Sequence, residues 1–264
     1  SLVDAEETLI LSDLDVNQVS ELARLGGTIK TGAIHASAKD REELIEAMVG
    51  LVWALRPGTE KVRVGVSAYH GGHRGKLAAL KTDMERIGMT LKRRLQEGRS
   101  VRLVTSKIPV LSSVIVKKQR LLEDGIEFCL FPDENEIRIG VTEAVQDFEE
   151  WSERDYNRPA RDARRGMLPP KLARTMINLT RKDPSAATLL DPFCGVGTVL
   201  AEGMALGYTH LIGSDIDEKA TEATRENLAW EAKRVGKEVE PQVIQSSAEA
   251  VGGFLAPASV DAIA

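Results

Sequence analysis

The sequence predicts an α/β protein whose last third is a parallel sheet wound with helices and whose earlier part consists of α+β units. Strand and helix patterns alternate from Lys171 onward, as βαβ units require. Upstream of that point, short strands with period-two alternation are separated by amphipathic helices. With 264 residues, the chain is too long for a single small module. We therefore expect several compact units.

Residues 1–58 are expected to form a small α+β unit. Asp40 is placed to cap a helix that Pro57 ends. Because the first residues arrive in the middle of the pattern, we expect an opening strand and helix to be missing. The expected elements are strands over residues 8–14 and 28–35 and helices over residues 16–25 and 41–55.

Residues 59–142 are expected to form a second α+β unit. The loop over residues 70–75 is rich in Gly and His and is too polar for a core, and we assign no role to His70 or His73. The expected elements are strands over residues 61–69, 100–106, 127–131 and 136–141 and helices over residues 77–96 and 112–122.

Residues 143–170 are polar, Arg-rich and bounded by prolines, which predicts a linker or docking segment rather than part of a core. The alternation over residues 171–264 then predicts the first part of a parallel sheet. The expected elements are helices over residues 172–180, 198–206 and 218–235 and strands over residues 188–193, 211–216, 243–247 and 260–264.

The composition excludes several classes of protein. A hydrophobic fraction of 42% and a charged fraction of 28% are those of an ordinary folded protein, not of a chain disordered throughout. No apolar run approaches the roughly 18 residues of a membrane span, and the first residues do not resemble a signal peptide, so we expect a cytoplasmic protein. Cys129 and Cys194 lie far apart, without metal-ligand spacing, so we expect neither a metal site nor a disulfide framework.

Two basic blocks stand out in a chain whose net charge is −5. Residues 56–120 carry 16 basic and 4 acidic side chains, and residues 151–182 carry 9 and 3. A polyanion would be attracted to these blocks and repelled elsewhere, which favours nucleic acid as a partner. A solvated face of Lys and Arg explains the charge alone equally well.

The stretch LLDPFCGVGTVL, residues 189–200, carries the clearest chemical signal. A buried strand ends at Asp191, and Gly195 and Gly197 form a tight turn that opens a helix. Glycine lets backbone N–H groups approach a ligand at a helix N-terminus. Asp215 ends the next strand, in LIGSDID, where a carboxylate can accept both ribose hydroxyl hydrogens. The pattern predicts a nucleoside site.

Two details favour S-adenosylmethionine over a dinucleotide at this site. Leu200 replaces the third glycine of the dinucleotide fingerprint, which weakens close packing around a pyrophosphate. Asp191 would repel a phosphate, but it could assist an amino group or a cationic ligand through bound water. S-Adenosylmethionine has both groups and no phosphate. The structural alternative is that Asp191 only caps the turn and that the glycines only interrupt the chain.

DPFCGVGT together with GSDID resembles the cofactor-binding core of Rossmann-like S-adenosylmethionine-dependent methyltransferases, a motif shared with DNA amino-methyltransferases. SERDYNRPARDARRGMLPPKLARTMINL resembles the segment that joins the two halves of THUMP-domain tRNA guanine-N2 methyltransferases. SVRLVTSKIPVLSSVIVKKQRLLEDGIEF resembles a THUMP domain, and LGGTIKTGAI resembles the ferredoxin-like unit that precedes it. The resemblance covers nearly the whole chain.

The resemblance implies methyl transfer from S-adenosylmethionine to the exocyclic N2 amine of a guanosine in tRNA, with position 10 as the expected target. It implies that the THUMP domain, residues 59–142, grips the tRNA acceptor end and that Met167, Leu168 and Lys171 lie near the donor pocket. The family's acidic residue after the third strand is replaced here by SSAE, residues 246–249. The implied cofactor-binding residues are Asp191, Pro192, Phe193, Gly195, Gly197, Thr198, Asp215, Ile216, Ser247 and Ala248.

The family's catalytic motif follows the fourth strand, where this sequence ends at Ala264. The resemblance therefore implies a catalytic residue beyond Ala264, leaves the catalytic residues of this chain unknown, and implies a truncated sheet with an exposed edge.

Contacts to tRNA are expected from cations and hydroxyls that suit phosphate oxygens. For each such residue a solvated surface role is equally expected. No membrane partner is expected, and a small activating protein subunit stays an open alternative. The candidates are Lys107, Ser112, Ser113, Lys117, Lys118 and Arg120, with a possible extension along Arg154, Arg158, Arg161, Arg164 and Arg165.

Three alternative functions remain at this point. The first is a non-catalytic RNA-binding homologue, suggested by the absent motif. The second is an rRNA guanine-N2 methyltransferase, which also uses a THUMP-like unit. The third, an NAD-dependent oxidoreductase, ranks last because the third glycine is missing.

Overall fold

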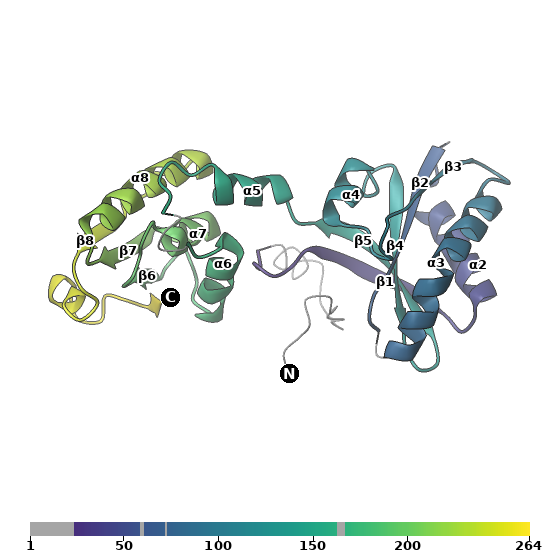
Figure 1. Ribbon diagram of the computed structural model, residues 1–264, viewed down its shortest axis with the longest axis horizontal. Helices are drawn as coiled ribbons and strands as arrows, with labels where there is room; N and C mark the ends of the chain where they lie inside the picture. The colour runs from purple at the N-terminus through teal and green to yellow at the C-terminus, as the bar shows by residue number, and fades with distance from the viewer. Residues whose placement is uncertain (1–23, 59–60, 72, 163–166) are drawn as a thin grey trace. The chain divides into compact units, whose positions relative to one another are not determined.

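The computed structural model describes residues 24–264, except 59–60, 72 and 163–166, and these residues form two compact units (Figure 1). Of the described residues, the first unit holds 29–146, and the second holds 24–28 and 147–264. The strand predicted over residues 8–14, and all but the end of the helix predicted over residues 16–25, lie outside the described residues.

The first unit is built on a five-stranded mixed sheet with the strand order β1-β5-β4-β2-β3. Strand β2 runs parallel to β3 and β4, and β5 runs antiparallel to β4 and β1. Its elements are β1 (Lys30–Ala38), α2 (Arg41–Leu55), β2 (Lys61–Ala68), α3 (Arg74–Leu95), β3 (Ser100–Val104), α4 (Ser113–Lys118), β4 (Gly125–Pro132) and β5 (Ile137–Val145).

Helices α2 and α3 cover one face of this sheet, and α4 covers the other (Figure 1). Val62 and Val64 of β2 share a core cluster with the buried residues of α2 and α3. Because side chains alternate along a strand, Gly65 faces the other side. A Cβ atom there would lie 2.4 Å from Leu111 Cδ1, so the chain beside α4 packs directly on the backbone of β2.

The predicted division between residues 1–58 and 59–142 does not appear in the described part of the chain. Strand β1 pairs with β5 along its whole length, and α2 packs in the same core as α3. The reason is that an edge strand and its helix cannot bury an apolar face alone, so they complete it against strands that come about a hundred residues later. Whether this unit functions as a THUMP domain stays a prediction.

Two helix boundaries in the first unit differ from those predicted. Helix α3 begins at Arg74 because the Nδ1 atom of His73 accepts a hydrogen bond from Lys76 N at 3.1 Å, so His73, to which we assigned no role, is the helix cap. Helix α4 ends at Lys118, well before residue 122. Arg120 then has a φ of 53°, in the left-handed region, which stops the helix.

The second unit contains a parallel four-stranded sheet with the order β8-β7-β6-β9. In chain order this is 3-2-1-4, the order of a Rossmann-like sheet, which confirms the predicted fold class. Helix α7 packs against both α6 and α8. Its elements are α5 (Phe148–Tyr156), α6 (Pro170–Leu179), β6 (Thr188–Asp191), α7 (Thr198–Leu206), β7 (His210–Asp215), α8 (Glu218–Val235), β8 (Gln242–Gln245), a 3-10 turn (Val251–Phe254) and β9 (Ala262–Ile263).

Most of the segment predicted as a linker, residues 143–170, belongs to the second unit and contributes to its core, which corrects that prediction, and residues 143–145 end β5 of the first unit. The segment contains α5, whose Arg154 is 4% exposed. Arg154 Nε donates a hydrogen bond to Glu202 of α7 at 2.7 Å, and Arg174 Nε of α6 donates to the other Glu202 oxygen at 2.9 Å. A polar, Arg-rich composition predicts a surface segment only when its charges lack buried partners.

A buried ionic network joins four strands of the first unit. Glu127 of β4 is fully buried and accepts hydrogen bonds from Lys30 Nζ at 2.6 Å, Ser67 Oγ at 2.6 Å and Thr142 Oγ1 at 2.7 Å. These partners lie on β1, β2 and β5. The network satisfies a carboxylate that would be very costly to bury alone.

We expect Lys30→Met to lower the free energy of unfolding by about 3–5 kcal/mol, because it leaves the Glu127 charge buried without its cation. Urea unfolding followed by circular dichroism measures this loss. Lys61→Met, at an exposed position of β2, is the matched control and should cost less than about 0.5 kcal/mol. Equal costs for the two variants would contradict a stabilising role for the Lys30–Glu127 pair.

None of the helices in the described ranges is both long enough and apolar enough to span a membrane.

Candidate functional site

Two carboxylates meet at the carboxyl edge of the parallel sheet. Asp191 ends β6 and Asp215 ends β7, and these strands are direct neighbours. Asp191 is 5% exposed, and its Oδ1 accepts a hydrogen bond from Phe193 N at 3.1 Å. Asp215 Oδ2 accepts from Gly195 N, and its Oδ1 accepts from Asp217 N, both at 3.0 Å. Backbone groups therefore fix both side chains in place, as the carboxyl edge of such a sheet allows.

Burial, together with the nearby negative charge of Asp215, raises the pKa of Asp191 to about 6 against the opposing effect of the Phe193 N–H. A carboxyl group with such a pKa changes charge close to neutral pH. A bound cation would favour its ionised form, so this edge of the sheet suits a ligand with a positively charged group.

The two glycines of the turn have different functions. Gly195 has a φ of 52° and Gly197 a φ of 80°, both in the left-handed region. A Cβ atom on Gly195 would find nothing nearer than Phe193 O at 4.0 Å, whereas one on Gly197 would lie 3.1 Å from Thr224 Cγ2 of α8. Gly195 therefore faces open space, where a ligand could approach the backbone, and Gly197 packs against α8.

Residues beside the carboxylates present apolar surface and a further backbone segment at the same edge. Phe193 is 76% exposed and Ile216 is 74% exposed. Ser246 N donates a hydrogen bond to Asp215 O at 3.0 Å, which brings the segment with Ser247 to the end of β7. The Ser247 hydroxyl accepts a hydrogen bond from Ala250 N at 3.3 Å, so it helps to start the 3-10 turn.

The structure brings most of the predicted cofactor residues to one edge of the sheet, with one important exception. Thr198 is 6% exposed, and its Oγ1 accepts a hydrogen bond from Arg158 NH1 at 2.6 Å. Its side chain is thus engaged behind the turn. Lys171, predicted to lie near the donor pocket, has its ammonium group 5.6 Å from the centroid of the Trp151 ring, and Leu168 packs against the core.

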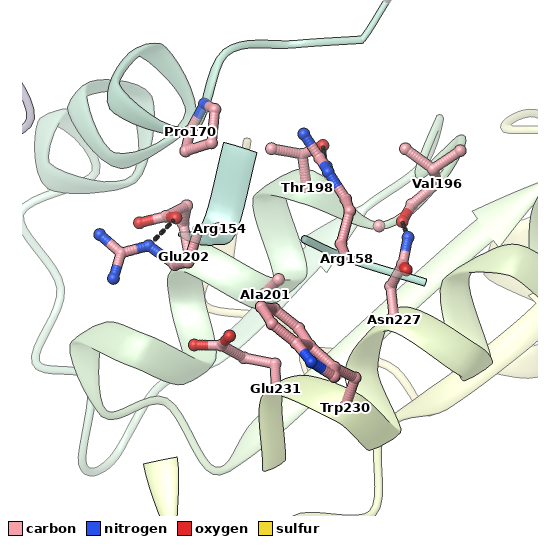
Figure 2. Close-up of a pocket in the computed structure, with 11 residues that line it drawn as sticks. Arg154, Arg158, Pro170, Val196, Thr198, Ala201, Glu202, Asn227, Trp230 and Glu231 are labelled. Atoms are coloured by element: carbon pink, nitrogen blue, oxygen red, sulfur yellow. Dashed lines mark hydrogen bonds and ion pairs between the residues drawn. The ribbon is translucent and has the colours of Figure 1, made fainter. Parts of the chain in front are cut away.

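A pocket lies behind the glycine turn, between α5, α7 and α8 (Figure 2). Val196, Gly197 and Thr198 of the turn line it, and Trp230 of α8 closes another side. Asp191 and Asp215 are not among its lining residues. The candidate ligand site therefore lies at the carboxylates in front of the turn. The residues around the pocket support the turn from behind.

Sequence reasoning missed two supporting residues of α8. Thr224 Oγ1 donates a hydrogen bond to Gly195 O, and Asn227 Nδ2 donates one to Val196 O, both at 2.8 Å (Figure 2 draws the second). A buried Thr and Asn three residues apart on one helix face were the available signal, since polar side chains on an otherwise buried face need partners.

The predicted RNA contacts fall into different classes in the structure. Lys107 and Lys118 are exposed, as a phosphate contact requires. Ser112 caps α4 by accepting a hydrogen bond from Ile115 N at 3.2 Å. Ser113 is 6% exposed, so its hydroxyl is not available to RNA. Arg120 lies 2.6 Å from Glu123 in an exposed ion pair.

The proposed extension of this surface along the second basic block is also corrected. Arg154 and Arg158 are buried, with side-chain partners of their own, so they do not form a phosphate-binding track. Arg161 is exposed, and Arg164 and Arg165 lie outside the described residues. Within the described ranges, His, Cys, Asp and Glu side chains form no group of three or more that could hold a metal ion.

The raised pKa of Asp191 predicts a pH-dependent stability. A carboxyl group whose pKa rises on folding destabilises the folded state when it is ionised, so its cost is present above about pH 6 and disappears as the pH falls below the pKa of the unfolded chain. We expect Asp191→Asn to raise the free energy of unfolding by about 2–3 kcal/mol at pH 7.5 relative to its effect at pH 4.

Urea unfolding at the two pH values tests this expectation. Asp261→Asn is the matched control, because Asp261 is an exposed carboxylate that also accepts one backbone N–H, from Thr188 at 2.9 Å. Its effect should change by less than about 1 kcal/mol over the same range. A pH-independent effect of Asp191→Asn would contradict the assigned cause of the shift.

Comparison with known proteins shows which proteins this site resembles. Residues 158–264 match the model of the UPF0020 family, described as RMKL-like, methyltransferase domain. The tRNA (guanine(10)-N2)-dimethyltransferase of Methanothermobacter thermautotrophicus is 46% identical over 63 residues, which are 24% of this chain and 18% of that protein. The protein of the same name from Methanocaldococcus jannaschii is also 46% identical over 63 residues, 24% of this chain and 17% of the relative. The matches thus span less than a fifth of these relatives.

Among solved structures, TrmN from Thermus thermophilus is 20% identical and has a TM-score of 0.49, with 94% of this chain and 64% of that chain covered. The family match contains the glycine turn and both carboxylates. The chain therefore carries, over residues 158–264, a methyltransferase domain similar to those that the UPF0020 family model describes.

Proposed function

We propose that this protein transfers a methyl group from S-adenosylmethionine to the exocyclic N2 amine of a guanosine in tRNA. The observation that carries the proposal is the glycine turn, open at Gly195 and flanked by Asp191 and Asp215, in a domain of a methyltransferase family. A turn of this kind at the carboxyl edge of a parallel sheet suits a nucleoside, and the two acids suit a cationic nucleoside rather than a phosphorylated one.

The residues present fit the donor. Asp215 would hold the two ribose hydroxyls, because each carboxylate oxygen accepts only one backbone N–H and retains a lone pair for a further donor. Gly195 would lie against the methionine part of the donor, where a larger residue would project into the space that we found open. Asp191 would face the cationic end of the donor, which favours its ionised form.

S-Adenosylmethionine supplies an electrophilic methyl group on a positively charged sulfur atom, and the contribution of this chain is to place it. The backbone bonds to Asp191 and Asp215 fix the acids before any ligand arrives, so little ordering cost is left for binding. Phe193 and Ile216 offer exposed apolar surface beside the acids, suited to the faces of the adenine and of a base turned out of its stack. No described residue is proposed to hold the target amine.

The choice of tRNA as substrate rests on the names of the relatives and on charge. The matched relatives are named for the N2 amine of guanine 10 and for dimethylation, and we propose the same position here. The first unit contains the basic block of residues 56–120, with Lys107 and Lys118 exposed, which suits a phosphate backbone. We propose that this unit acts as the THUMP domain of the enzyme.

A labelled-methyl transfer assay with the full-length protein and unmodified tRNA tests the proposal. We expect labelled N2-methylguanosine or N2,N2-dimethylguanosine after nucleoside analysis, and a position-10 guanosine-to-adenosine tRNA should accept no label. Label in rRNA but not in tRNA would favour the rRNA alternative. Binding of tRNA without any methyl incorporation would favour a non-catalytic homologue and overturn the proposal.

Donor affinity should depend on pH through Asp191. Protonation of this carboxyl near pH 6 removes the charge that would face the cationic end of the donor, so we expect the Kd of S-adenosylhomocysteine, which keeps the ammonium group, to rise by about three- to tenfold from pH 7.5 to pH 5. Isothermal titration calorimetry measures this change. Asp191→Asn should bind more weakly at pH 7.5 and lose most of the pH dependence, whereas an unchanged dependence in that variant would assign the titration to another group.

A further inference from the structure

Two side chains of α8 hold successive carbonyl groups of the glycine turn from behind. Thr224 Oγ1 donates to Gly195 O, and Asn227 Nδ2 donates to Val196 O, each at 2.8 Å. Thr224 is 0% exposed and Asn227 is 2% exposed. Residues three apart on a helix lie on one face, so α8 presents both donors to the turn together.

Asn227 also binds a second segment. Its Nδ2 donates to Ala160 O at 2.9 Å, and its Oδ1 accepts from Ala160 N at 2.9 Å. Both of its amide hydrogens and its carbonyl oxygen are therefore used. Asn227 joins three parts of the second unit, namely α8, the glycine turn and the chain that follows α5. Figure 2 shows its bond to the turn.

The segment around Ala160 makes one more contact with the turn. Arg158 has a side chain that is 4% exposed, and its NH1 donates to Thr198 Oγ1 at 2.6 Å. Thr198 is the first residue of α7, directly after Gly197. Residues 158–160 are thus held beside the end of the turn by two contacts, one from Arg158 to Thr198 and one between Ala160 and Asn227.

These bonds determine more than the position of the turn. In a planar trans peptide the N–H group points opposite to the C=O group. Hydrogen bonds that hold the carbonyls of Gly195 and Val196 toward α8 therefore turn the N–H groups of Val196 and Gly197 away from α8. The Gly197 N–H also donates to Cys194 O at 2.6 Å, so Asn227 and this turn bond together hold the second plane. Thr224 holds the first plane at Gly195, where the backbone has left-handed φ and no Cβ atom.

We propose that Thr224 and Asn227 are positioning residues of the donor site, which fix the peptide planes of the glycine turn so that its open side receives S-adenosylmethionine. This inference rests on the proposed function, because it needs a donor at that side. The two residues touch no ligand themselves. They act through the backbone of residues 195–197. Because Asn227 also binds Ala160, the geometry of the turn depends on the position of residues 158–160.

Thr224→Val and Thr221→Val form a matched pair for the test. Valine has nearly the shape of threonine and lacks the hydroxyl donor. Thr221 lies on the same helix and is 1% exposed, but its Oγ1 donates within the helix, to Glu218 O at 2.8 Å, rather than to the turn. Both substitutions remove one buried hydroxyl from α8, and only one of them removes a bond to the turn.

Binding of S-adenosylhomocysteine to the full-length protein, measured by calorimetry beside the thermal midpoint of each variant, gives the readout. We expect Thr224→Val to raise the Kd by about tenfold. Thr221→Val should change the Kd by less than about twofold, while it lowers the thermal midpoint about as much as Thr224→Val does. In steady-state assays, Thr224→Val should raise KM for S-adenosylmethionine far more than KM for tRNA.

A Thr224→Val protein that binds as tightly as the parent, or that loses affinity only in proportion to stability as Thr221→Val does, would overturn the inference. If the parent protein itself does not bind S-adenosylhomocysteine, the proposed function fails instead, so the two failures are distinct.

Asn227→Ser provides a second, independent measurement. We expect it to weaken donor binding and also to speed hydrogen exchange at the amide of Ala160, which Asn227 Oδ1 protects, by at least about tenfold. Thr224→Val should leave that amide unchanged. Equal exchange rates at Ala160 in the parent and the Asn227→Ser variant would contradict the proposal that Asn227 links the glycine turn to residues 158–160.

Discussion

Glu202 is the buried charge on which the arrangement of the second unit depends. It is 1% exposed on α7, and it accepts hydrogen bonds from Arg154 of α5 and Arg174 of α6. Both guanidinium groups also lie over the Trp151 ring, at 4.4 and 4.6 Å from its centroid. Burial raises the pKa of Glu202 in spite of both cations, which shows how strongly it is desolvated. Such a cluster adds little net stability over apolar packing, but it is satisfied in one arrangement only.

That arrangement matters because α5 leads directly into the segment that supports the glycine turn. With Arg154 held on Glu202, the chain leaves α5 at a fixed place, and Arg158 and Ala160 follow it against Thr198 and Asn227. The same cluster reaches α8, since Glu150 accepts from Arg234 as well as from Arg154. The ionic cluster therefore helps to position both segments that bind the turn, namely α8 and residues 158–160.

Prediction from the sequence succeeded where the signal is local. The strand, turn and helix around Gly195 and Gly197 and the strand ends at Asp191 and Asp215 lie where they were predicted, and the bounds of α7 and α8 agree with the periodicity. The binding roles of these residues stay predictions. Prediction failed where the deciding partner is distant. The pairing of β1 with β5, and the burial of Arg154 by Glu202, depend on contacts across 48 residues or more that no local pattern contains. The cap of α3 by His73 was missed because histidine is a rare helix cap.

The two sides of the glycine turn affect the stability of the free protein in opposite directions. In front, Asp191 is held in a buried position that penalises its charge at neutral pH, so the free protein carries an electrostatic cost that a cationic ligand would relieve. Behind the turn, Thr224 and Asn227 donate hydrogen bonds to the carbonyl groups of Gly195 and Val196. Because these hydrogen bonds form without a ligand, the turn keeps its shape in the free protein. The buried carboxylate in front, whose charge is disfavoured, would then favour binding of a cation without loosening the backbone that it depends on.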